Sequence, residues 1–104
     1  MKSFFINPKL KEEIYSLDKV TTSKLTMLIN LLENHDKNLG MPYSKKISQN
    51  LYELRVNSQQ QLRVFYCFYK DKIIFIHYII KKCQKTPHQD IQTALKRIKL
   101  LTNT

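Results

Sequence analysis

A run of eight residues, numbered 73–80 (IIFIHYII), constrains the fold more than any other part of the sequence. It is rich in β-branched and aromatic side chains and lacks alternating polar positions, which predicts a central strand covered on both faces. Residues 62–69 (LRVFYCFY) are a second strong strand candidate, and residues 70–72 between the two runs predict a hairpin turn. Residues 51–56 (LYELRV) alternate in a strand-like way. Three consecutive strands joined by short turns predict an antiparallel meander.

Helical spacing of apolar residues marks the segment before these strands. Asn7 followed by Pro8 is typical of an N-cap with proline in the first helical position. A second amphipathic helix is predicted from a cap at Asp18 or at residues 21–22, and it runs to about Asn34. Two helices joined by a short turn predict a helical hairpin.

Local signals complete the secondary structure. Residues 2–6 suit a short strand or an extended lead-in, and Gly40 suits the left-handed residue at a helix exit. The last helix is expected to begin with Thr86 as its N-cap and Pro87 in the first helical position. Gln89, three residues after the cap, would complete a capping box.

These elements together predict an α+β fold. An N-terminal helical hairpin packs on a small antiparallel sheet, and a C-terminal helix closes the structure. A length of 104 residues suits one domain, spanning residues 1–104.

The charge balance indicates the class of partner. Lysine and arginine number 18 against 8 aspartate and glutamate, a formal net charge of +10. On so small a domain this charge creates a positive surface that attracts polyanions, with nucleic acid first, an acidic protein segment second and an anionic membrane third. The longest apolar run is less than half of a membrane-spanning helix, and no secretory signal pattern is visible. We therefore expect a cytoplasmic protein without a membrane partner.

Several classes of catalytic site are excluded by composition. Cys67 and Cys83 are not in a CxxC pattern, which favours reduced thiols over a disulfide or a metal site. One glycine does not build a phosphate-binding loop, and the three histidines are scattered. We therefore expect no cofactor and no metal, so an enzyme of this sequence would work with arginine, lysine, tyrosine or histidine.

Basic residues of this kind gather in the second half of the chain. Arg55 and Arg63 lie on successive predicted strands, and Lys81, Lys82 and Lys85 follow the third. A meander can bring these side chains onto one surface, where cations stabilise the charge that develops on a phosphate during RNA cleavage. The alternative is that they form ordinary solvated strand and loop positions.

Aromatic and histidine residues lie between these basic residues in the sequence, and they too have both a functional and a structural interpretation. Tyr66 and Tyr78 could stack on bases, although tyrosines in such strands belong more often to the core. His77, inside the apolar run, is better interpreted as a core histidine with a hydrogen-bond partner than as a catalyst.

The motifs of residues 40–101 resemble a known toxin family. They are GMPYSKKI (40–47), LYELRV (51–56), LRVFYCFY (62–69) and KKCQKTP (81–87), followed by a helix with the pattern A-x-x-R at Ala94 and Arg97. In this order and spacing they resemble the phage-derived Gp49-like/HigB branch of the RelE/ParE toxin superfamily.

The resemblance implies a function. Its members are toxins of type II toxin–antitoxin systems, with a RelE-like fold, and act as metal-independent, ribosome-dependent mRNA endoribonucleases (mRNA interferases) that inhibit translation. The implied partners are a cognate HigA-like helix-turn-helix antitoxin and mRNA on the ribosome. Some superfamily members instead poison DNA gyrase, so a non-enzymatic growth inhibitor or a degenerate toxin is the alternative.

The resemblance also suggests site residues. Some relatives carry lysine at the position of Glu53, so any acid–base role of this residue must differ or be absent. The expected catalytic residues are Arg55, Arg63, Lys82 and His88, and the expected RNA-binding residues are Lys45, Lys46, Lys81, Lys85 and Tyr66.

Overall fold

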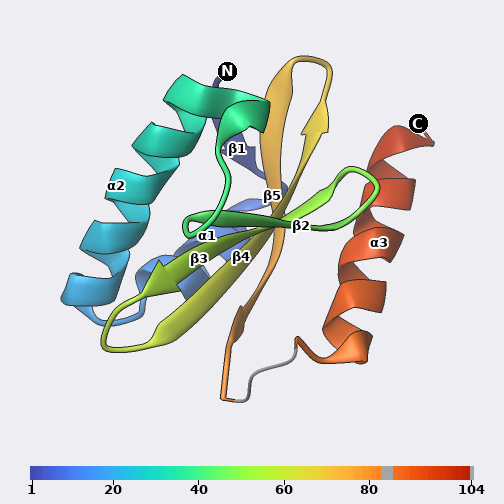
Figure 1. The fold of residues 1–104 in the computed structure, drawn as a ribbon. Coiled ribbons are helices and arrows are strands. Elements are labelled where there is room, and N and C mark those ends of the chain that lie inside the picture. Colours follow the sequence, from blue (N-terminus) through green and yellow to red (C-terminus); the bar gives the residue numbers. More distant parts are fainter. Residues whose placement is uncertain (83–85, 104) are drawn as a thin grey trace.

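The computed structural model describes residues 1–82 and 86–103, and its elements are drawn in Figure 1. In chain order they are β1 (Ser3–Phe5), α1 (Pro8–Tyr15), α2 (Lys19–His35), a 3-10 helix (Asp36–Asn38), β2 (Ser44–Ser48), β3 (Leu51–Asn57), β4 (Gln61–Tyr69), β5 (Lys72–Ile80) and α3 (His88–Thr102). The described residues thus form a mixed α+β fold with three α-helices and one five-stranded sheet. Among them, no helix has the length and hydrophobicity needed to cross a membrane.

The sheet extends the expected meander at both sides. Its strand order is β1-β5-β4-β3-β2, and β2 to β5 pair antiparallel in sequence order. β1 lies parallel to β5, so the sheet is mixed and not purely antiparallel. The segment SKKIS of β2 has one apolar residue, so its sequence carries no alternating signal, and it becomes a strand by pairing its backbone with β3.

The helices cover the two faces of the sheet unequally (Figure 1). α1 contacts β1 and β5 while α2 contacts β3, and both pack into one apolar cluster with the sheet. α3 packs on the opposite face against β4 and β5, where a second cluster forms around Phe65, Cys67 and Ala94. The expected N-terminal hairpin is therefore better described as a β1–α1–α2 unit, because a strand of the sheet precedes the helices and each helix covers its own strands.

The first two helices begin where the sequence predicts. The side chain of Asn7 accepts a hydrogen bond from the backbone of Leu10 at 2.8 Å, and Pro8 opens α1. Asp18 caps α2 by accepting from the backbone of Thr21 at 2.9 Å, and this hydrogen bond holds the pKa of its carboxyl below the ordinary value. The prediction for the exit of α2 is wrong: the left-handed residue is Asp36, with φ of 51°, while Gly40 has no positive φ.

β5 is buried on both faces only in its first half. Within the described chain β1 pairs with Ile73–Phe75, Ile76 is also buried, and residues 77–80 are partly exposed. The prediction of a central strand therefore holds for the first half alone. A bulge separates the halves, because Phe65 pairs with His77 and Tyr66 with Phe75, leaving Ile76 as an extra residue.

The bulge directs His77 toward α3. Its Nε2 lies 2.8 Å from Oδ1 of Asp90, and its ring stacks on Phe65. Arg97 of α3 donates to the carbonyl of Ile76 at 2.6 Å. His77 is thus a partly buried histidine with a partner, as the sequence indicated, and these contacts hold α3 against β5.

α3 begins differently from the prediction. Its N-cap is Pro87, and among the described residues no side chain caps this helix. The hydroxyl of Thr86 instead donates to Oε2 of Glu53 at 2.9 Å. The expected capping box is wrong because the side chain that would build it is bound to the sheet.

Candidate functional site

Arg55 and Arg63 lie side by side on the face of the sheet that α3 covers in part. They are direct partners in the β3–β4 register, so their side chains emerge next to each other. Glu53 shares this face because it lies two residues before Arg55 on the same strand. Its Oε1 is 3.7 Å from Nε of Arg63 and 3.9 Å from Nε of Arg55. One carboxylate therefore faces two guanidinium groups.

This cluster is buried but not fully satisfied. Glu53 is 1% exposed and Arg63 4%, while the Arg55 side chain retains 22% exposure. Among the described residues, the Nε atoms of both arginines are buried without a hydrogen-bond partner. Burial lowers the pKa of Arg63, and the positive charge of Arg55 lowers it further, against the opposing effect of Glu53. The cluster has a net positive charge and unused donors, a combination that an anion would stabilise.

An open hollow of about 360 Å³ lies over this cluster. Four basic residues and one acidic residue line it, with two isoleucines as its apolar part. The lining residues are Lys45, Lys46, Ile47, Glu53, Arg55, Lys81, Thr86 and Ile91. Lys45 faces the site because it pairs with Glu53 across β2 and β3.

The structure brings together four of the expected site residues: Arg55 and Arg63 on the sheet, and Lys45 and Lys81 around the hollow. Lys46 also contributes to the lining, but its ammonium group lies 5.9 Å from the ring centroid of Tyr52, which packs with the α1–α2 cluster on the other face. Lys82 is exposed and lines a neighbouring groove of about 610 Å³, together with Lys81, His77 and Asp90.

Two of the expected residues, Tyr66 and His88, do not join the cluster. Tyr66 is 1% exposed in the α1–α2 cluster, where its hydroxyl is hydrogen-bonded to Ser44, and burial raises its pKa to about 12. Burial on that face removes Tyr66 from the candidate RNA contacts. His88 is an exposed residue at the start of α3 and is not part of the lining of the hollow. Lys85 lies outside the described residues.

Two residues of the site were missed by the sequence interpretation. Glu53 could have been found by alternation, because residues 53 and 55 of one strand must share a face. Thr86 could not have been found, because its sequence context is that of a helix cap.

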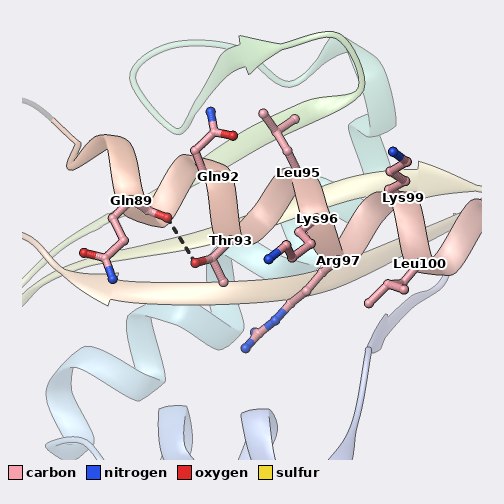
Figure 2. A pocket seen from close by; sticks show the side chains of 8 residues that line it. All are labelled: Gln89, Gln92, Thr93, Leu95, Lys96, Arg97, Lys99 and Leu100. Atoms are coloured by element: carbon pink, nitrogen blue, oxygen red, sulfur yellow. Dashed lines mark hydrogen bonds between the residues drawn. The ribbon is translucent and has the colours of Figure 1, made fainter.

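A larger hollow, of about 760 Å³, lies along α3 alone (Figure 2). Its lining comes from one helix, and Thr93 uses its hydroxyl within that helix, donating to the carbonyl of Gln89 at 3.0 Å. Arg97 points away from the hollow toward the sheet, and Leu100 is 68% exposed. Size alone does not make this the functional site, because the buried, unpartnered donors lie beneath the smaller hollow.

Residues 12–99 match the profile of a protein family described as phage-derived protein Gp49-like (DUF891). The match includes all of α2, the four antiparallel strands and the cluster of Arg55, Arg63 and Glu53. No curated protein matches the chain.

Proposed function

The chain belongs to the Gp49-like family of phage-derived proteins, and from this premise we propose that it is a toxin that cleaves messenger RNA on the ribosome. The family is related to toxin–antitoxin systems. One observation carries the enzymatic part of the proposal: two arginines with unused buried donors lie beneath a hollow lined by lysines. Such a site is suited to a phosphodiester, which is anionic and gains further charge as it reacts.

The proposed reaction uses the RNA's own 2′-hydroxyl as nucleophile. The 2′-oxygen forms a bond to phosphorus, the bond from phosphorus to the 5′-oxygen breaks, and the products are a 2′,3′-cyclic phosphate and a 5′-hydroxyl. A base takes the proton from the 2′-hydroxyl and an acid supplies one to the 5′-oxygen. DNA lacks the nucleophile, so the mechanism is restricted to RNA.

The exposure of each basic side chain indicates whether it contacts the phosphate directly or stabilises its charge from a distance. Arg55, the more exposed arginine, contacts the phosphate, and the buried Arg63 adds its charge from behind. Lys81 lies across the hollow and completes the stabilisation of the pentavalent phosphate. Lys45 binds the phosphate of a neighbouring nucleotide, and Lys46 stays a prediction as an RNA contact. Lys82, Lys85 and His88 stay predictions as proton donors or supporting cations.

The proposed partners follow from the same surface. A cognate antitoxin with a helix-turn-helix domain would present an acidic surface to the lysines around the hollow, consistent with the net charge of +10. Binding of this partner would stabilise the folded toxin by mass action.

The test compares two variants that each lose one positive charge. Arg55→Gln removes the cation at the cluster, whereas Lys9→Gln removes an exposed cation on α1, which covers the other face of the sheet. Each variant is induced in cells and mRNA cleavage is mapped by primer extension. We expect wild type and Lys9→Gln to cut mRNA, and Arg55→Gln to cut it about 100-fold more slowly.

The opposite pattern rejects the proposal. DNA damage with intact mRNA after wild-type induction identifies a gyrase poison. Equal cleavage by Arg55→Gln and Lys9→Gln removes the arginine cluster from the active site.

A further inference from the structure

Thr86 occupies a position where its hydroxyl would normally stabilise a helix. It precedes Pro87 at the start of α3, and a threonine there satisfies the free backbone N–H groups of the first turn. α3 has no such cap among the described residues. The Thr86 hydroxyl therefore does not form the capping hydrogen bond with the first turn of α3, and we expect a hydrogen bond elsewhere to compensate for its loss.

The compensating interaction is a hydrogen bond to a buried charge. Oγ1 of Thr86 donates to Oε2 of Glu53 at 2.9 Å, across 33 positions of sequence. Glu53 is 1% exposed, so its carboxylate depends on protein donors in place of water. Its other oxygen, Oε1, faces Arg55 and Arg63. Thr86 is thus bonded to the group that the two arginines share.

This bond places Thr86 in the lining of the hollow together with a lysine from the end of β5. The backbone N–H of that lysine, Lys81, donates to the carbonyl of Gln61 on β4 at 2.8 Å. Thr86 is held by Glu53. Both Lys81 and Thr86 line the hollow above the arginines.

We propose that Thr86 is a positioning residue, whose hydrogen bond fixes the Glu53 carboxylate against Arg55 and Arg63 and holds the start of α3 beside the hollow. The assignment deepens the proposed function and rests on it for its effect on catalysis. The hydroxyl does not touch the substrate; it fixes the carboxylate that orients Arg55 toward the phosphate. A loss of this geometry reduces the rate of the chemical step more than the binding of RNA.

Three substitutions test the role of the hydroxyl. Thr86→Val keeps the shape and removes the donor, whereas Thr86→Ser keeps the donor and removes the methyl group. Thr93→Val makes the same chemical change in α3, at a hydroxyl that bonds only within its own helix (Figure 2). The folded fraction of each protein is first measured by circular dichroism and urea unfolding.

Cleavage of ribosome-bound mRNA is then measured for each variant. We expect Thr86→Val to lower kcat about 10- to 100-fold with KM within about twofold of wild type. Thr86→Ser and Thr93→Val should cleave within about threefold of wild type. Equal rates for Thr86→Val and Thr93→Val overturn the proposal, and so does a Thr86→Ser variant as slow as Thr86→Val, because the methyl group would then be the part that matters.

A second measurement does not depend on RNA cleavage. The amide of Ile91, which donates to the carbonyl of Pro87, reports the stability of the first turn of α3 through its hydrogen exchange. Thr86→Val should accelerate its exchange about tenfold, while Thr86→Ser and Thr93→Val leave it unchanged. If wild type does not cleave mRNA, the proposed function fails and this exchange alone decides whether Thr86 anchors the start of α3. Unchanged exchange in Thr86→Val overturns the anchoring role.

Discussion

The two faces of the sheet are built from the same strands but carry different kinds of side chain at β3 and β4. On the α1–α2 face, Leu54 and Val56 of β3 meet Leu62 and Val64 of β4, and all four are fully buried among apolar neighbours. On the α3 face, the alternate positions of the same two strands include Glu53, Arg55 and Arg63.

Because successive side chains of a strand point to opposite faces, the same two strands carry core residues on one face and the proposed site residues on the other. Burial of apolar side chains stabilises the fold on both faces, but among the described residues the α3 face also holds two buried arginine Nε atoms without a hydrogen-bond partner, which costs stability. Substitutions on the two faces should therefore have opposite consequences for stability and activity.

The largest expected change in the free energy of unfolding comes from a substitution on the α1–α2 face. Leu25 of α2 is fully buried there, so Leu25→Ala should lower the free energy of unfolding by about 2–5 kcal/mol through lost burial and a cavity. The neighbouring Met27 is 59% exposed, so Met27→Ala should change it by less than about 0.5 kcal/mol. Urea unfolding measures both variants. Similar losses in the two would contradict the division between the faces.

The α3 face should respond in the reverse direction. Arg63→Met replaces a buried cation by an apolar side chain of similar length, so the free energy of unfolding should stay constant or rise by about 1 kcal/mol. mRNA cleavage should fall about 100-fold in the same variant, because a charge behind the phosphate is lost. Urea unfolding and primer extension are measured on one preparation. A large loss of stability would mean that Arg63 supports the fold and not the site.

The smallest expected effect depends on pH, at the edge of the α1–α2 face. The depressed pKa of Asp18 means that its ionised form stabilises the folded state above the unfolded-state value of about 3.8, and this contribution is lost as the pH falls through the lower folded value. Asp18 also accepts a hydrogen bond from Gln60 in the β3–β4 turn, at 3.1 Å. Asp18→Asn keeps a capping oxygen without titrating, so its melting temperature should fall less than that of wild type between about pH 6 and about pH 2.5. Equal decreases would show that this cap does not contribute to acid unfolding.

The elements that could be predicted from the sequence are those decided by local chemistry. The side chains of Asn7 and Asp18 accept hydrogen bonds from backbone N–H groups three residues later. The strands β3, β4 and β5 are recognisable by their β-branched and aromatic content. β2 depends on a partner strand, and the bulge at Ile76 depends on register with β4, so neither leaves a local signal.

The same distinction applies to the site. Arg55 and Arg63 could be placed together because successive antiparallel strands with a short turn pair nearby residues. Lys81 was expected with them and does line the hollow, whereas Lys82 lines the next groove. The Thr86–Glu53 contact spans two elements far apart in the chain, and the local capping signal pointed elsewhere.

The bulge at Ile76 has a consequence for how this chain can vary among homologues. Phe75 and His77 pair with adjacent residues of β4, so Ile76 is a one-residue insertion that could be deleted without shifting any other pair of the ladder. Its carbonyl, however, is the acceptor for Arg97. We therefore expect coevolution: lineages that have lost the inserted residue should also be free to lose the arginine of α3, and an alignment of many homologues would reveal the two as a correlated pair.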